Sequence, residues 1–253
     1  MRIKINLRFS IKLRLPAGYN NLIQAFIYNH LGEKSDWLHE EGFKHDNRKF
    51  KLFCYSGILE YGKFCHAEKL FVFPEAVSFY LSSPVDWIIQ NIAAHTLLEK
   101  QSHLGRNIGM IESIEVRKST PPRSNSIRCR TLSPIENHST FMTAGNKKKT
   151  YYYSPFETEF SELTNSNLQK KWQSLHNEEC PYTIKIEPKF NSHKRESIIN
   201  YGSGDNKTVV KAWHGHFQLT GDPEFLQFAL DAGLGGRNSQ GFGMVDVLEE
   251  KEE

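Results

Sequence analysis

The sequence contains little cysteine and no long hydrophobic run. The cysteines form no C-x-x-C pair, which argues against a disulfide-stabilised scaffold and against a zinc site built on thiolates; they are Cys54, Cys65, Cys129 and Cys180. No stretch reaches the ~20 apolar residues that a transmembrane helix needs, and the charged N-terminus is unlike a signal peptide. We therefore expect a cytoplasmic protein without a membrane partner.

The chain also lacks a strong net charge. A formal charge of +3 at pH 7 over 253 residues does not by itself indicate a partner. The basic residues are clustered, however: residues 117–149 hold eight Lys or Arg and one acid, and residues 1–14 hold five basic residues and no acid. Such patches are typical of proteins that bind a polyanion, although solvated surface charge gives the same pattern.

A strand that leads into a glycine-rich turn, the signature of a nucleotide cofactor site, is also missing, and we predict no cofactor and no bound metal. Glycine is instead concentrated in residues 233–243, the glycine-rich loop, where two Gly-apolar-Gly triplets bracket a mostly polar segment. A helix is predicted before this loop and a strand after it, the reverse of a nucleotide-binding loop. The expected ligand is therefore a nucleic-acid backbone.

We expect Arg237 and the backbone amides of this loop to contact RNA phosphates, because glycine lets another backbone approach closely and arginine binds phosphate well. The loop residues predicted to contact RNA beside Arg237 are Gly233, Gly235, Gly236, Asn238, Ser239, Gly241 and Gly243. Arg128 and Arg130 lie on a predicted strand and would extend the basic track. A bulged turn that only packs two elements together is the alternative interpretation.

Residues 2–15 alternate between apolar and polar without exception, which predicts one strand with a buried face and a basic, solvent-facing face. An open basic sheet is one way in which small α+β modules hold RNA. The elements that follow give the order β-α-β-β-α-β, the ferredoxin-like arrangement. They are predicted helices at 19–31, 35–41 and 83–99 and predicted strands at 50–59, 77–81 and 108–116.

The second half repeats this order of elements without repeating the sequence. Its predicted strands are 127–132, 182–190 and 242–248, with a hairpin at 198–219 that turns at residues 203–206, and its predicted helices are 155–175 and 222–232. The segment between the halves contains a Pro-Pro pair and is predicted to be a linker. We therefore predict an α+β protein with two tandem ferredoxin-like (RRM-like) domains, 1–120 and 121–253, each with an antiparallel sheet.

The two glycine triplets and their spacing resemble the C-terminal motif of the repeat-associated RAMP superfamily. Within it, the chain is similar to the CRISPR-associated (Cas) endoribonucleases that process pre-crRNA, the sixth Cas family. The resemblance continues in order along most of the chain, at Leu15-Pro16, Leu38-His39-Glu40, Lys51-Leu52-Phe53, Thr131-Leu132-Ser133-Pro134-Ile135 and Ala212-Trp213-His214.

This resemblance implies that the partner is CRISPR repeat RNA and that the chain cuts it without a metal, leaving a 2′,3′-cyclic phosphate and a 5′-hydroxyl. It places the catalytic tyrosine, histidine and lysine of the family on Tyr28, His39 and Lys51. Lys44, His45 and Lys49 lie close by in the sequence. His45 and Lys49 are the alternatives to His39 and Lys51, so the choice of histidine and of lysine stays open.

These residue types suit attack by the 2′-hydroxyl that RNA itself carries. Histidine side chains in general titrate near neutrality, so we assign proton transfer to His39. We assign stabilisation of the developing phosphorane charge to Lys51 and orientation of the hydroxyl to Tyr28. The alternative function is a non-catalytic RNA-binding RAMP subunit of a CRISPR ribonucleoprotein complex. Association with other Cas proteins and formation of a homodimer are both compatible with the sequence.

Overall fold

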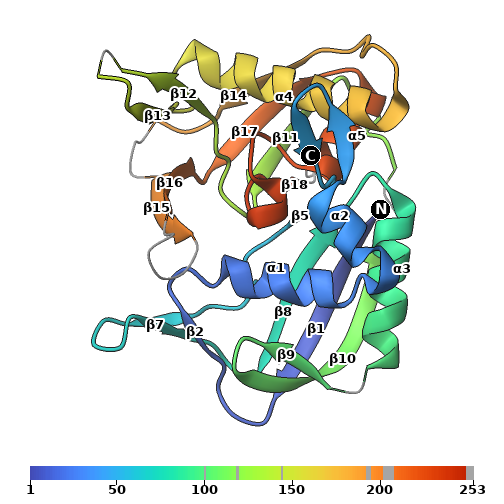
Figure 1. Cartoon of the computed structure of the whole chain (residues 1–253), viewed down its shortest axis with the longest axis vertical. Coiled ribbons are helices and arrows are strands. Elements are labelled where there is room, and N and C mark those ends of the chain that lie inside the picture. The colour runs from blue at the N-terminus through green and yellow to red at the C-terminus, as the bar shows by residue number, and fades with distance from the viewer. Residues whose placement is uncertain (100, 118–119, 144, 192–194, 202–207, 249–253) are drawn as a thin grey trace, which may run out of the picture.

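The alternating apolar residues of the N-terminus form the central strand of the first of two antiparallel sheets. The structure is a computed structural model, and it describes residues 1–99, 101–117, 120–143, 145–191, 195–201 and 208–248 (Figure 1). Strand β1 (Arg2–Phe9) lies between β8 (Ala76–Ser82) and β10 (Asn107–Arg117). With β5 (Cys54–Tyr55) and β9 (Ser102–Leu104) at the edges, the strand order is β5-β8-β1-β10-β9.

Two helices cover the apolar face of this sheet. Helix α1 (Asn20–Asn29) buries Ile23, Phe26 and Ile27, which share one face because the last two follow Ile23 by three and four residues. Helix α3 (Asp86–Leu98) buries Ile88, Ile89 and Ile92. Together with the inward side chains of β1 and β8 these residues form one hydrophobic core.

The second sheet has the same chain order and the same layout. Its strands are ordered β14-β17-β11-β18, and its helices are α4 (Thr158–His176) and α5 (Pro223–Ala232). Helix α5 begins as the sequence predicts, since the Asp222 carboxylate accepts a hydrogen bond of 2.9 Å from the Glu224 amide and Pro223 occupies the first turn. The fold prediction of two ferredoxin-like units is confirmed. The strands are β11 (Ser126–Thr131), β14 (Ile184–Pro188), β17 (His216–Gly221) and β18 (Val245–Val247).

The prediction of a single strand over residues 2–15 is wrong. Strand β1 ends at Phe9, and the chain resumes as β2 (Arg14–Pro16) in a separate sheet with β7 (Leu70–Val72) and β6 (Lys63–Cys65). Ile11, which lies between β1 and β2, is 71% exposed although the alternation would bury it. The alternation shows which residues are buried but not where one strand ends. It continues from β1 to β2 because both sheets bury every second residue.

The expected open basic face of this strand is also wrong, because carboxylates of β10 neutralise it. Lys4 Nζ lies 3.6 Å from Glu115 Oε1, and Arg8 Nη2 lies 2.6 Å from Glu112 Oε1. Arg2 is buried. The N-terminal strand therefore does not present the row of free cations that RNA would need.

Smaller hairpins are inserted between the core elements, and the sequence did not separate all of them. The predicted strand over 50–59 divides into the end of β4 (Arg48–Phe50) and β5. The predicted hairpin over 198–219 becomes β15 (Glu196–Tyr201) paired with β16 (Thr208–Trp213), followed by β17, and its predicted turn at 203–206 lies outside the described residues. A further pair, β12 (His138–Met142) and β13 (Lys148–Tyr152), was not predicted.

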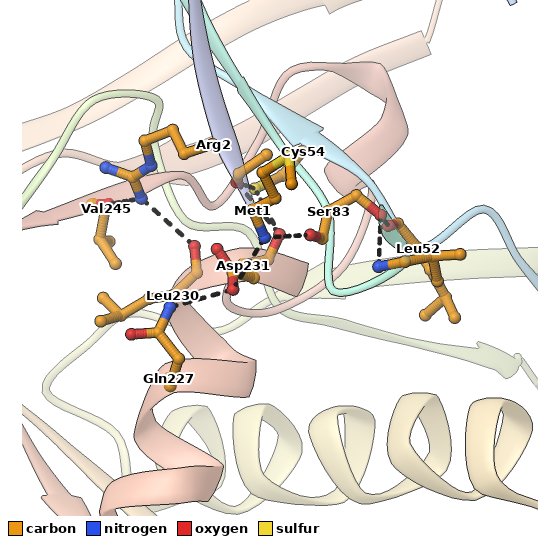
Figure 2. A network of polar contacts seen from close by, with 11 residues as sticks. Met1, Arg2, Leu52, Cys54, Ser83, Gln227, Leu230, Asp231 and Val245 are labelled. Atoms are coloured by element: carbon orange, nitrogen blue, oxygen red, sulfur yellow. Dashed lines mark hydrogen bonds and ion pairs between the residues drawn. The ribbon is translucent and has the colours of Figure 1, made fainter. Parts of the chain in front are cut away.

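The two units pack against each other through polar contacts at the glycine-rich loop and at the N-terminus. Gln24 Nε2 of α1 donates to Ser239 O at 2.8 Å, and Asn20 Nδ2 donates to Gly241 O at 3.2 Å. Figure 2 shows the second contact, where the Arg2 guanidinium donates to Val245 O at 2.8 Å and to Leu230 O at 3.3 Å.

The predicted domain limit near residue 120 lies between β10 of the first sheet and β11 of the second. In the described part of the chain, no helix combines the length and the apolar character needed to span a bilayer.

Candidate active site

Three segments of the N-terminal unit bring Tyr28, His39 and Lys51 together. Tyr28 lies at the end of α1 and His39 on α2 (Ser35–Glu40), and their rings meet edge to face with centroids 5.0 Å apart. The Lys51 ammonium donates a hydrogen bond to the backbone carbonyl of His39. The three residues named from the sequence motifs are therefore neighbours in space, although 23 positions separate the first from the last.

Lys51 reaches α2 because the chain turns back on itself between them. Gly42 ends α2 with φ +62°, where a Cβ would lie 2.5 Å from Phe50 O, so only glycine fits comfortably. The hairpin of β3 (Phe43–His45) and β4 follows and returns the chain to Lys51. Next, Leu52 has φ +50°, an unfavourable conformation for a side chain of this kind, and its carbonyl is held by the Ser83 hydroxyl at 2.6 Å.

A basic groove of about 370 Å³ joins this region to the C-terminal unit. One wall is the segment that carries Lys51, and the other is formed by α4 and the glycine-rich loop. In the part of the chain that the structure describes, five cationic side chains and no acidic one line the groove; the cations are Arg48, Lys49, Lys51, Lys171 and Arg237. A groove of this charge, open between two modules, attracts a polyanionic strand.

The surroundings of the three residues affect the pKa of Tyr28 and Lys51 and the hydrogen bonding of His39. Burial, and next the neighbouring Tyr201, raise the pKa of the half-buried Tyr28, so its phenol stays a neutral hydrogen-bond donor at neutral pH. Burial, and next the charge of Lys49, lower the pKa of Lys51. The exposed His39 ring has Nδ1 2.7 Å from Glu40 Oε1, a contact that favours the proton on Nδ1 and leaves Nε2 as an acceptor.

His45 and Lys49, the alternatives to His39 and Lys51, lie in two different places in the structure. His45 has Nε2 3.4 Å from Asp46 Oδ2 and lies in a different cavity, with Asn177 and Glu178 beyond the end of α4. Lys49 does line the basic groove, but its ammonium donates to Glu40 O at 2.9 Å and lies 3.6 Å from Glu41 Oε1. His39 and Lys51 are thus the histidine and lysine that contact each other.

The glycine-rich loop is held in place by its own backbone and by Asn238. The buried Asn238 amide donates to Leu234 O at 3.0 Å and to Phe242 O at 3.1 Å. Several glycine amides predicted to face RNA instead donate to carbonyls of the protein, namely those of Gly233, Gly236, Gly241 and Gly243. The RNA contacts of this loop stay a prediction, and in this conformation Arg237 is the group best able to make them.

Arg237 lies at the outer bend of the loop, in the left-handed region with φ +54°. Its Nη1 donates to Gln240 Oε1 at 3.0 Å, and its Nε lies 4.0 Å from Oε1 of the fully buried Glu136. Nε is buried and has no hydrogen-bond partner within the part of the chain that the structure describes. The guanidinium is therefore oriented by the protein while part of its donor capacity stays unused.

Arg128 and Arg130 are not among the residues that line the groove. They lie on β11 with exposed side chains, and Arg130 Nη2 is 3.6 Å from Asp246 Oδ2. Their contact with RNA stays a prediction and would use a different surface. Of the cationic groove residues, the sequence missed two, Arg48 and Lys171. Arg48 could have been found from its place beside Lys49 and Lys51, but Lys171 stands in a helical pattern that gave no signal.

Among the described residues, no cluster of three or more His, Cys, Asp or Glu side chains is placed to hold a metal ion.

Comparison with known proteins gives one consistent family. Residues 117–247 match the family described as CRISPR associated protein Cas6, C-terminal. The chain is 26% identical to CRISPR-associated endoribonuclease Cas6 1 of Methanocaldococcus jannaschii, over 99% of this chain and 94% of that one. It is 28% identical to CRISPR-associated endoribonuclease Cas6 of Pyrococcus furiosus, over 92% and 84%. A solved structure of a Cas6-related gene product from Pyrococcus furiosus covers 99% of each chain at 19% identity, with a TM-score of 0.81.

Proposed function

Because the chain belongs to the Cas6 family of CRISPR-associated proteins, we propose that it is an endoribonuclease that cuts CRISPR repeat RNA without a metal ion. The observation that carries the proposal is the contact of Tyr28, His39 and Lys51 beside a groove lined by five cations. RNA supplies the nucleophile, its 2′-hydroxyl, so the protein has to position that group, assist proton transfer and stabilise charge. The three side chains match these tasks.

In the proposed reaction His39 takes the proton of the 2′-hydroxyl while water protonates the leaving 5′-oxygen, or water takes the first proton and His39 delivers the second. Its Nδ1 contact with Glu40 leaves Nε2 to accept a proton, and a protonated ring would donate one. The 2′-oxygen bonds to phosphorus, the bond from phosphorus to the 5′-oxygen breaks, and the products are a 2′,3′-cyclic phosphate and a 5′-hydroxyl. One well-placed proton transfer of this kind accelerates a reaction about 10²–10⁴-fold.

Lys51 and Tyr28 act on charge and on position. The Lys51 ammonium uses one of its three N–H groups on the His39 carbonyl, and the other two are left for the phosphorane oxygens. Since burial keeps the phenol of Tyr28 protonated, Tyr28 donates a hydrogen bond that orients the ribose, and it does not act as a base. The RNA backbone next to the cut lies along the groove, against Arg237.

The experiment is to incubate the purified protein with the CRISPR repeat RNA of its own genome in EDTA and to map the ends. Cleavage at one position, with a cyclic phosphate on the upstream product, is expected. A single 2′-deoxy substitution at the scissile nucleotide should prevent cleavage and leave binding unchanged. Cleavage that needs an added divalent ion, or that survives the 2′-deoxy substitution, would contradict the mechanism.

The same experiment distinguishes the alternative, a non-catalytic RNA-binding subunit. Such a subunit would bind the repeat RNA and leave it intact under every condition. The proposed function also places the protein in the cytoplasm with its RNA substrate.

A further inference from the structure

Helix α4 carries a buried lysine on the face that packs into the core. Phe160, Thr164, Leu168 and Lys171 follow one another at helical spacing, and all four are buried. Lys171 is 3% exposed. An ammonium group taken out of water is strongly destabilising unless its N–H groups are hydrogen-bonded, so its partners show why a lysine is tolerated there.

Those partners belong to the glycine-rich loop. Lys171 Nζ donates to Gly233 O at 2.8 Å and to Gly235 O at 3.1 Å. Gly233 is the residue that ends α5, so its carbonyl lies at the negative end of the helix dipole, where a cation is favoured. The next residues along the chain are Gly236 and Arg237, on the wall of the basic groove.

We propose that Lys171 is a positioning residue that fixes the glycine-rich loop in the conformation in which Arg237 and Ser239 face the RNA backbone. The inference rests on the proposed function, because it assigns Lys171 a part in binding the same RNA. Lys171 donates hydrogen bonds to the first triplet of the loop. Asn238 donates to Leu234 O and to Phe242 O and so connects the two triplets. The first triplet leads directly into Arg237, so the lysine acts on the residue predicted to touch phosphate.

The charge of Lys171 gives this role a pH dependence. Burial lowers the pKa of Lys171 to about 7, and the second and smaller cause, the Cys54 thiol on β5, acts in the opposite direction. Among the described residues, the other charged groups that line the groove are cations, on Arg48, Lys49, Lys51 and Arg237. The buried Glu136 carboxylate lies behind Arg237, 4.0 Å from its Nε. A phosphate in the groove favours the ammonium form, so RNA binding takes up a proton, and RNA affinity falls as the pH rises through and above 7.

The first test measures RNA affinity in a His39→Ala background, which removes cleavage and the His39 imidazole. Repeat RNA is titrated by fluorescence anisotropy between pH 6 and 9 against variants that add Lys171→Met, Lys171→Gln or Lys170→Met. We expect Lys171→Met to bind about tenfold more weakly at pH 6 and to show little change with pH. Lys171→Gln keeps an N–H₂ donor group without the charge, so its RNA affinity should be intermediate at pH 6 and should change equally little with pH. Lys170→Met, the next residue on the same helix, should keep the wild-type profile.

The second test needs no RNA. Native trypsin cleavage after Arg237, mapped by mass spectrometry, should be faster in Lys171→Met than in Lys170→Met, with thermal melting as the check that each variant is folded. If His39→Ala alone does not bind the repeat RNA, the proposed function fails. The protease result then still tests whether Lys171 fixes the conformation of the loop. If RNA binds and Lys171→Met and Lys171→Gln keep the affinity, the pH profile and the cleavage rate of the control, the inference is overturned.

Discussion

Arg2 and Asp246 form an ion pair of 3.0 Å, although 244 positions separate them in the sequence. The pair joins the first strand of the N-terminal unit to the last strand of the C-terminal unit. The same guanidinium donates to Leu230 O and Val245 O (Figure 2). The first basic residue of the chain therefore holds the two units together, and the groove between them depends on that packing.

Replacement of Arg2 by alanine should destabilise the protein by about 2–4 kcal/mol, because two carbonyls and one carboxylate lose a buried donor. The matched control is Arg8→Ala. Arg8 pairs with Glu112 at 2.6 Å but is about half exposed, and an exposed pair contributes about 0–1 kcal/mol. Urea unfolding of both variants checks the prediction, which is wrong if the two lose the same stability.

The glycine-rich loop should not tolerate a side chain at Gly243. This residue has φ +77°, and a Cβ on it would lie 1.9 Å from Leu234 O, so alanine forces the loop to move. We expect Gly243→Ala to weaken RNA binding by about tenfold or more, since Arg237 would be displaced. Gly145→Ala, where a Cβ meets nothing within 4 Å, is the control and should bind as wild type does.

Much of the fold could be predicted because helical and strand periodicity are local properties. The apolar arc of α1 and the Asp222-Pro223 start of α5 are examples, since neighbouring residues determine each of them. The break after Phe9 could not be predicted, because both sheets bury alternate residues and the pattern does not say which strand is the neighbour. The burial of Arg2 depends on carbonyls more than 220 positions away.

The candidate site, like the fold, could be predicted only in part. Tyr28, His39 and Lys51 were named from resemblance, and the resemblance says nothing of the hydrogen bond that joins Lys51 to the His39 carbonyl. Lys171 could not be named at all. A lysine in an amphipathic helix is normally assigned to the solvent-exposed face. The carbonyls of Gly233 and Gly235, which accept hydrogen bonds from Lys171, explain why this lysine lies in the core.

Lys51 should limit the reaction on the alkaline side. Loss of a group that stabilises the phosphorane charge typically lowers the rate about 10²–10³-fold, which is the effect expected for Lys51→Ala. The reaction needs the ammonium form, and burial and the charge of Lys49 lower the pKa of Lys51. Cleavage should therefore decline with rising pH before an ordinary lysine would deprotonate.

The matched control, Lys49→Ala, removes the neighbouring charge and so raises the pKa of Lys51. The decline in the cleavage rate of Lys49→Ala should move to higher pH. Its rate at neutral pH should stay closer to that of wild type than the rate of Lys51→Ala does. Single-turnover rates from pH 6 to 10 measure both effects. An unchanged alkaline limb in Lys49→Ala would mean that another group controls it.

His39 and His45 give the sharpest comparison at the site, because they lie six positions apart and only one contacts Tyr28 and Lys51. His39→Ala should lower the cleavage rate about 10²–10⁴-fold through the loss of proton transfer and leave RNA affinity near that of wild type. His45→Ala should cleave normally, since its ring faces Asp46 and the end of α4. Single-turnover cleavage and binding assays on the same RNA separate the two effects. A large loss in His45→Ala together with a small loss in His39→Ala would transfer the catalytic role to His45 and move the reaction away from the contact between Tyr28, His39 and Lys51.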